Sequence, residues 1–374
     1  APTPHRLPMK YSARIDGLRF VAITLVFCDH FASFFFHRIS AGYYGVELFF
    51  VISGYLITSI LLDSGNTPFG KAYLNFMGRR TLRIFPIYYL MLAILWLLHD
   101  PVVHEFLLFA LTYTFNYASE YYHITHSSLD HTWSLCVEEQ FYLFWPVIVL
   151  LLRRLPRVLM AVMIGIVVLG FCQLAFGIFP ALSPYNHGGL LSRIPALGIG
   201  SLGAIYVRHF TMPDRFFKNL GIELAMIALL CLFLVTDLTI KPLGLAFISL
   251  YLILKASKYD FRLQFLSKFL ANPRVVYIGT ISYGLYLYHL PISLYFSKYI
   301  FEPIWSKIPF EEWGRLSALY YHREIIQFPL YSLLSLILAI FSFRYIEKPL
   351  LKLKDRFFKK SENPAPSEQK MTQG

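Results

Sequence analysis

Residues 19–30 read RFVAITLVFCDH, an apolar run that opens on Arg19 and closes on Asp29 and His30. Its flanks keep the segment hydrophobic enough to cross a bilayer, which takes ~20 apolar residues in a helix. Ionisable side chains inside a membrane are costly, so each one suggests a function. The rise of a helix places His30 ~16 Å deeper than Arg19. If Arg19 marks the inner boundary, His30 lies near the middle of the bilayer or slightly outside it.

A structural interpretation stays open for each residue taken alone. Arg19 could extend its charged end to the cytosolic interface, and His30 could hydrogen-bond a neighbouring helix. Asp29 is adjacent to His30 in sequence but points to another face of the helix. The pair Arg19 and His30 is therefore the functional candidate.

The composition of the whole chain predicts an all-α polytopic membrane protein. Of the 374 residues, 56% are hydrophobic and 15% are charged, whereas soluble domains carry about a quarter charged residues. The net charge of +12 does not indicate a nucleic-acid partner, because the basic residues lie between apolar spans, as topogenic charges do. Four cysteines lie in apolar runs without metal-ligand spacing, so we expect no disulfide framework and no metal site.

Hydropathy and length predict about ten transmembrane helices. They are expected at residues 15–37, 42–63, 81–98, 137–153, 157–178, 189–208, 219–236, 239–256, 275–297 and 326–346. An eleventh apolar stretch, 104–118, is short. Basic residues alternate between loops as the positive-inside rule requires only if this stretch does not cross. We therefore expect 104–118 to be re-entrant or interfacial on the outer side.

The same alternation predicts the domain organisation and places both termini in the cytosol. Residues 1–14 form a cytosolic N-terminal segment, 15–349 a single membrane domain, and 350–374 a tail that is first basic and then disordered. One predicted external loop, 298–325, departs from the rule because it carries four basic residues.

Two further stretches carry charge into the predicted spans. In YYGVELFFVISGYLITSILL (43–62), Glu47 lies near the outer end, while Gly42, Gly45 and Gly54 are typical of close helix packing. In GRRTLRIFP (78–86), three arginines stand where the chain re-enters the membrane from the cytosol. They are either topogenic charges or a fork for phosphates, which arginine binds in a bidentate manner. Both interpretations remain open for Arg79, Arg80 and Arg83.

The stretch HTWSLCVEEQFYLFWP (131–146) places further polar side chains at the outer start of a span. Counted back from Arg153, Glu138 lies ~22 Å from the inner edge, close to the depth of His30. A carboxylate that accepts from one imidazole nitrogen fixes the tautomer and raises the basicity of the other nitrogen. We therefore expect Glu138 to orient His30. Glu139 points about 100° away and is the weaker candidate.

Taken together, these motifs resemble the membrane-bound acyltransferase-3 family from about Tyr11 to Pro349. The resemblance rests on Arg19 and His30 with ten residues between them, GVELFFVISGYLI (45–57), RRTLRIFP (79–86), HTWSLCVEEQFYLFWP, SYGLYLYHLP (282–291) and IEKP (346–349). Two departures are mild: Glu47 stands where aspartate is more usual, and WSLC replaces WSLS. The chain ends without the fused C-terminal hydrolase-like domain of some relatives, and so resembles the stand-alone branch.

The resemblance implies an acyl-CoA donor, usually acetyl-CoA, used from the cytosolic side of a bacterial cytoplasmic membrane. The acceptor would be a hydroxyl of an extracytoplasmic glycan, glycolipid or other molecule. Arg19 would be required together with His30, and Arg79, Arg80 and Arg83 would lie near the donor. We expect these three arginines and Arg19 to form a cytosolic basic mouth for the CoA phosphates.

From these residues we hypothesise that His30 deprotonates the acceptor hydroxyl and that Glu138 orients it. The outer segment 99–136 would line the acceptor site, although a wet loop would be equally rich in tyrosine. The acceptor-binding candidates are Glu47, Asn116, Tyr122, Trp133 and Ser134. Two alternatives remain open: a covalent acyl-His30 intermediate, and a flippase or exporter of lipid-linked glycans that uses no acyl-CoA.

Overall fold

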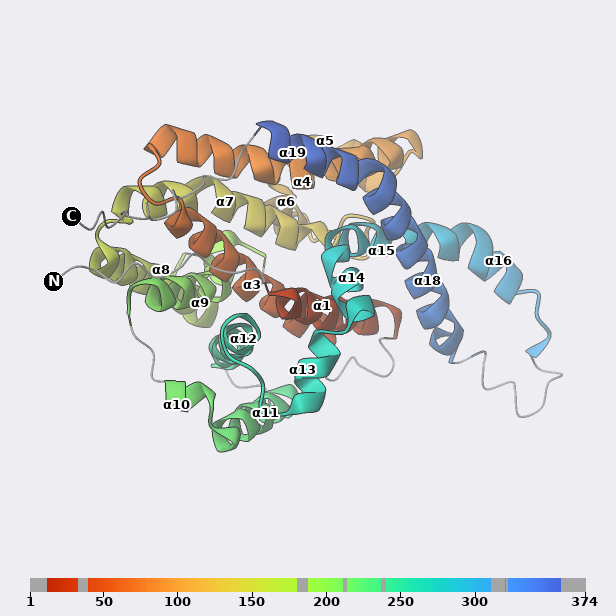
Figure 1. Ribbon diagram of the computed structural model, residues 1–374. Coiled ribbons are helices and arrows are strands. Elements are labelled where there is room, and N and C mark those ends of the chain that lie inside the picture. The colour runs from red at the N-terminus through yellow and green to blue at the C-terminus, as the bar shows by residue number, and fades with distance from the viewer. Residues whose placement is uncertain are drawn as a thin grey trace, which may run out of the picture.

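The computed structural model describes residues 12–32, 40–179, 188–210, 214–236, 240–310, 320 and 322–357. Every regular element in these ranges is a helix. The predicted class, an all-α polytopic membrane protein, is confirmed. Figure 1 shows helices from distant parts of the sequence crossing at the middle of the molecule, where α1 (Ala13–Phe31) and α3 (Ala41–Asp63) lie.

Six helices in the described part of the chain are long and apolar enough to cross a membrane. Besides α3 they are α4 (Phe69–Leu97), α7 (Thr132–Leu152), α8 (Pro156–Phe176), α9 (Leu190–His209) and a continuous run made of α18 (Glu324–Ser342), η3 (Phe343–Glu347) and α19 (Lys348–Phe357). Their lengths suit a bilayer whose apolar core is ~30 Å thick.

The other helices are shorter or more polar. Besides α1 they are α5 (Pro101–Leu111), α6 (Phe115–Tyr121), α10 (Asp214–Phe217), α11 (Leu220–Val235), α12 (Lys241–Ser257), α13 (Gln264–Leu270), α14 (Pro273–Thr280), α15 (Ser282–Phe296), η1 (Ser297–Phe301) and α16 (Glu302–Trp305). Helical structure occupies the described part of each of the ten positions predicted to span, while residues 33–37 and 239 of those positions lie outside the described residues. The segment 275–297 is divided at Ile281. Because six helices of the described part of the chain meet the length and hydropathy of a span, the count of ten stays a prediction.

The segment 104–118 does not form one helix. It is covered by α5 and α6, and the chain turns between them, where Tyr113 has a φ of 53°. Helix α5 starts at Asp100, whose side chain accepts from the backbone N–H groups of Val102 and Val103, with Pro101 in the first turn. Each helix is shorter than the ~20 residues needed to cross. The break suits the predicted re-entrant or interfacial position, which stays a prediction.

The predicted terminal segments lie largely outside the described residues. Of the N-terminal segment 1–14, the first eleven residues are not described, and the tail is described only to residue 357. The described part of the tail belongs to α19. The limits 1–14, 15–349 and 350–374 therefore stay predictions.

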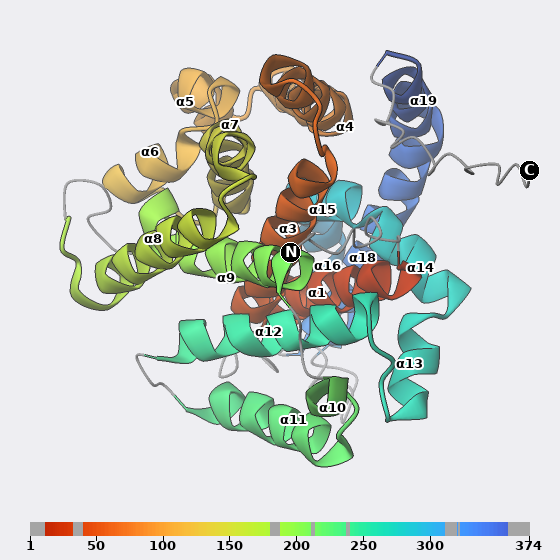
Figure 2. The same ribbon diagram turned by 60° about the vertical axis from the view of Figure 1, so that its left-hand side comes forward.

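Helix α1 lies at the centre of the molecule. It contacts α3, α12, α13, α14, α15 and α18, and Figure 2 shows these helices around it while α5, α6 and α11 lie at the periphery. Helix α3 packs against α1, α7, α9 and α12. The two helices that carry the candidate charges of the first spans thus both lie within the bundle.

Glycines bring these helices into backbone contact. A Cβ atom on Gly45 would overlap the carbonyl oxygen of Ala22 in α1, and one on Gly54 would overlap that of Leu197 in α9. A Cβ atom on Gly42 would lie 2.7 Å from the Asp29 carboxylate. The predicted role of these glycines in close packing is confirmed, because a larger residue would have to displace a backbone at Gly45 and Gly54 and the Asp29 side chain at Gly42.

We expect Gly54→Ala to lower stability by roughly 1–3 kcal/mol, the usual cost of overpacking, because the added methyl meets a backbone carbonyl that cannot move aside. Thermal unfolding in detergent measures the effect. The matched control is Gly165→Ala in α8, where a Cβ atom meets nothing within 4 Å. Equal melting temperatures for the two variants would contradict the packing role of Gly54.

Candidate active site

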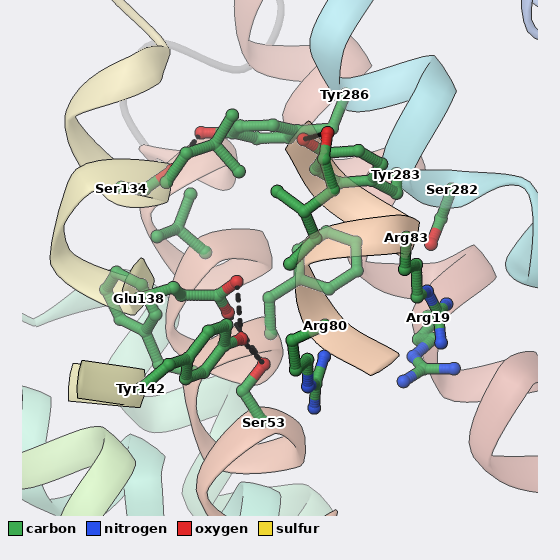
Figure 3. A pocket seen from close by; sticks show the side chains of 15 residues that line it. Arg19, Ser53, Arg80, Arg83, Ser134, Glu138, Tyr142, Ser282, Tyr283 and Tyr286 are labelled. Atoms are coloured by element: carbon green, nitrogen blue, oxygen red, sulfur yellow. Dashed lines mark hydrogen bonds between the residues drawn. The ribbon is translucent and has the colours of Figure 1, made fainter. Parts of the chain in front are cut away.

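A cavity lies between α1, α3, α4, α7 and α15, with an unfilled volume of about 660 Å³ that includes its open side. Figure 3 shows that the guanidinium groups of Arg19, Arg80 and Arg83 gather on one side of it. Across from them lie the polar side chains of α7 and of α3. The cavity is therefore cationic on one side and rich in hydroxyl groups on the other.

The cationic side of the cavity is formed by Arg19 of α1 and by Arg80 and Arg83 of α4, which the sequence analysis had grouped together. The Arg80 guanidinium lies over the Tyr142 ring, 4.8 Å from its centroid, and Arg19 pairs with Asp16 at 2.6 Å. Among the described residues, no carboxylate forms an ion pair with Arg80 or Arg83. Guanidinium groups bind phosphates and carboxylates in a bidentate manner, so this side of the cavity suits an anion.

Arg79, the fourth arginine predicted to bind the donor, is not among the residues that line the cavity. At 3.6 residues per turn, Arg83 lies between Arg79 and Arg80 around the helix. Arg79 therefore lies on the side of Arg83 that is away from Arg80. The cavity joins three of the four predicted arginines.

Glu138 lies in the wall of the same cavity, but its predicted contact with His30 is wrong. One carboxylate oxygen accepts a hydrogen bond from the Ser53 hydroxyl at 2.7 Å, and the other accepts from Tyr142 at 2.9 Å (Figure 3). The helical rise used for the prediction gives depth but not direction. Glu138 faces α3 and the aromatic ring on which Arg80 rests.

The partner of His30 comes from α15. His30 Nδ1 lies 3.0 Å from Nε2 of His289, and the two rings are tilted with centroids 4.9 Å apart. On its other side His289 Nδ1 lies 2.7 Å from the carbonyl oxygen of Tyr286. His289 is fully buried, whereas His30 is exposed at the end of α1. The exposed imidazole is thus backed by a buried one.

A third imidazole, His131 at the start of α7, completes this cluster. Its ring meets that of His289 edge to face, 5.0 Å between centroids, and its Nε2 lies 3.0 Å from the Leu287 carbonyl oxygen. Proline at 291 has no N–H to bond that carbonyl in the helix, so Pro291 leaves Leu287 available to His131. In the described part of the chain no group of His, Cys, Asp and Glu side chains could hold a metal ion.

Tyr286 separates the histidine cluster from the cavity. Its hydroxyl lies in the cavity wall, donates to the His131 carbonyl oxygen at 3.0 Å and pairs with the Ser134 hydroxyl at 2.7 Å. Its backbone carbonyl accepts from His289. Ser134, a predicted acceptor-binding residue, thus lines the cavity next to this tyrosine. One residue of α15 contacts both parts of the site.

Two other predicted acceptor-binding residues, Glu47 and Trp133, belong to a separate buried cluster. Glu47 forms an ion pair with Arg193 of α9 at 3.3 Å, and both side chains are buried. The Arg193 guanidinium lies 5.0 Å from the centroid of the Trp133 ring. Neither Glu47 nor Trp133 lines the cavity. In this structure the glutamate joins α3 to α9.

The last two acceptor-binding candidates lie further out. Asn116 is buried and its amide is used on both sides: it donates to the Gly188 carbonyl at 3.0 Å and accepts from Gln140 at 3.0 Å. The bond from Gln140 holds α6 against α7, and the bond to Gly188 ties α6 to the segment that precedes α9. Tyr122, at the end of α6, is exposed and packs on Phe106. Of these two, only Tyr122 presents its side chain to solvent.

Sequence reasoning missed His289, the partner of His30, and Arg193, the partner of Glu47. Both carried a signal, because each is an ionisable side chain inside a predicted span. His289 stands within SYGLYLYHLP, which was used only as a mark of family resemblance. Their partners lie far away in sequence, at His30 and Glu47, so spacing alone could not pair them.

Together the fold and the site define a polytopic helical membrane protein in which a cavity lined by three arginines adjoins paired imidazoles. A profile of the acyltransferase domain matches residues 12–344. The chain therefore belongs to the acyltransferase-3 family, and the resemblance noted in the sequence is confirmed.

Two curated relatives cover nearly all of this chain. The peptidoglycan O-acetyltransferase OatA of Listeria monocytogenes is 28% identical over 375 residues, 93% of this chain and 57% of the relative. The O-acetyltransferase OatA of Staphylococcus aureus is 28% identical over 381 residues, 93% of this chain and 59% of the relative. The chain thus spans less than two thirds of the length of these relatives. No solved structure matches it.

We expect Glu138→Leu to be less stable than the wild-type protein by roughly 1–3 kcal/mol. The change removes the acceptor of the Ser53 hydroxyl and the shorter of two bonds made by the Tyr142 hydroxyl, which keeps only Ser53 at 3.3 Å. In Glu138→Gln the new side-chain amide can still bond both hydroxyls, so we expect a smaller loss of stability. Thermal unfolding of both variants measures the difference. Equal losses of stability in Glu138→Gln and Glu138→Leu would show that the carboxylate does not hold this wall of the cavity through hydrogen bonds.

Proposed function

We propose that the chain is a membrane O-acyltransferase that moves an acyl group, by default acetyl, from cytosolic acyl-CoA to a hydroxyl of an extracytoplasmic acceptor. One observation carries the proposal: Arg80 and Arg83 line a cavity without an ion-pair partner among the described residues, and Tyr286 of the same cavity bonds the His30–His289 pair. An anion site next to an exposed imidazole suits a donor with phosphates at one end and a thioester at the other.

The donor would bind with its CoA phosphates against the arginines. Arg80 and Arg83 are positioned for phosphate oxygens, and Arg19 adds a third guanidinium that Asp16 partly neutralises. Charge-assisted hydrogen bonds of this type are worth about 1.5–3 kcal/mol each. Arg79 lies outside the cavity lining and would contribute less.

His30 would act as general base on the acceptor hydroxyl. The hydroxyl oxygen bonds to the thioester carbonyl carbon as its proton passes to the imidazole, and the carbon–sulfur bond breaks. The departing thiolate of CoA then takes the proton from the imidazolium, which returns His30 to its neutral state. The exposed position of His30 at the end of α1 supports its contact with an acceptor that arrives from outside the cavity.

The relatives support a carbohydrate acceptor in the bacterial cell envelope, since one of them is a peptidoglycan O-acetyltransferase. Ser134 and Tyr286 carry hydroxyl groups between the cavity and the imidazoles and are placed to contact either substrate. Exposed Tyr122 suits a sugar face, whereas Asn116, Glu47 and Trp133 would act by holding helices in place. The distribution of basic residues supports a cytoplasmic membrane location with both termini in the cytosol.

We expect His30→Ala to lower kcat by at least about 100-fold, the lower end of what a general base contributes, while CoA binding stays near the wild-type value. The assay uses purified protein in detergent with radiolabelled acetyl-CoA and oligomers of N-acetylglucosamine, and counts label in the sugar. Wild-type protein incubated without sugar tests the covalent alternative: labelled protein would support an acyl-His30 intermediate. Near-normal transfer by His30→Ala would remove the general-base assignment.

We expect Arg83→Ala to weaken CoA binding by about 10- to 100-fold, the equivalent of the lost charge-assisted bonds. CoA-dependent thermal stabilisation measures the affinity, with ADP as the comparison nucleotide. Arg274→Ala is the control, because that exposed arginine lies outside the cavity lining. If CoA stabilises neither the wild-type protein nor the control, the glycan flippase without acyl-CoA chemistry becomes the better explanation.

A further inference from the structure

We propose that His289 is a positioning residue that sets the tautomer of His30. Nε2 of His30, the nitrogen that does not contact His289, is then the one that acts as base. This inference rests on the proposed function, since it concerns how its base is prepared. It replaces the role that the sequence had suggested for Glu138. Hydrogen-bond chemistry fixes in turn the proton of His289, its neutral charge and the proton of His30.

The first step is the bond between His289 and the backbone of its own helix. Nδ1 of His289 lies 2.7 Å from the Tyr286 carbonyl oxygen, a normal hydrogen-bond distance. A carbonyl oxygen can only accept, so Nδ1 of His289 carries a proton. The neighbouring ring, His131, is fixed in the same way by the Leu287 carbonyl, with its proton on Nε2.

The second step is the charge of His289. The side chain is fully buried, and within the described part of the chain no carboxylate pairs with it. An unpaired charge in such a place is costly, which favours the neutral imidazole. With its single proton on Nδ1, His289 presents a lone pair at Nε2.

The third step is the position of the proton on the His30 ring. Nε2 of His289 lies 3.0 Å from Nδ1 of His30 and can only accept. His30 must therefore donate through Nδ1, and in its neutral form its Nε2 holds no proton. That nitrogen is the one able to take a proton from a hydroxyl. When it does so, the His30 imidazolium still donates to His289, and a hydrogen bond with an ionised donor is the stronger kind.

The packing around His289 prevents its ring from turning over. Phe27 stacks on it at 5.6 Å, Phe31 meets it edge to face at 5.9 Å, and His131 at 5.0 Å. A turned ring would lose the bond to the Tyr286 carbonyl. All three neighbours come from outside α15, the two phenylalanines from α1 and His131 from the start of α7, so the tertiary fold holds the buried imidazole in one orientation.

The test compares two amides that keep different halves of the His289 imidazole. In His289→Gln the amide oxygen stands near the place of Nε2 and can still accept from His30, whereas in His289→Asn the shorter amide reaches only the Tyr286 carbonyl. We expect kcat of the Gln variant to stay within about tenfold of wild type and that of the Asn variant to fall by about 100-fold. KM for acetyl-CoA is expected to be unchanged in both. Equal kcat values for Gln and Asn would overturn the inference.

A second measurement needs neither variant to fold. Protein labelled with ¹⁵N-histidine distinguishes protonated from unprotonated ring nitrogens by chemical shift, and the signals of His30 are those that His30→Ala removes. We expect the neutral ring of His30 to carry its proton on Nδ1. A proton on Nε2 would refute the proposal. If His30→Ala itself kept full transfer activity, the proposed general base would fail whatever His289 does, so the two failures are distinguishable.

Discussion

The contact of α3 with the backbones of α1 and α9 is the constraint on which the site depends. At Gly45 and Gly54 the helices approach more closely than any side chain would allow. Helix α1 is held in the same way from its other sides, since Gly17 meets the Leu270 backbone and Gly279 meets that of Asp16. Such contacts fix both the position and the rotation of α1, and with them the directions in which Arg19 and His30 point.

Within this framework, two buried ion pairs join helices. Glu47 binds Arg193 between α3 and α9, and the fully buried Lys255 pairs with Glu223 at 2.8 Å between α12 and α11. A charge left alone in such a place would cost several kcal/mol. Arg80 and Arg83 of α4 line the cavity and form no ion pair among the described residues, which is why we propose that they serve a ligand and not the fold.

The sequence predicted the elements of the site better than their pairing. Helix positions, the packing glycines and the grouping of Arg19 with Arg80 and Arg83 could be read from apolar lengths, small residues and charges in spans. The depth of Glu138 was estimated along one helix, yet depth does not give the face that a residue presents, and Glu138 turned to Ser53 and Tyr142. The true partner of His30 lies 259 residues away on α15, a distance over which no helical spacing carries information.

A single helix carries one residue from each half of the proposed reaction. Arg19 lies at the cationic end of the cavity, and His30 lies ~16 Å further along α1 by helical rise. Because the helix is rigid and held by backbone contacts, this separation cannot adapt to the donor. Under the proposed function, a donor would be used only if its thioester lies at a matching distance from its phosphates. His289 determines a second quantity, the protonation of the His30 nitrogen that meets the acceptor. Helix α1 therefore sets the distance between the two ends of the site, and α15 sets the tautomer of the base.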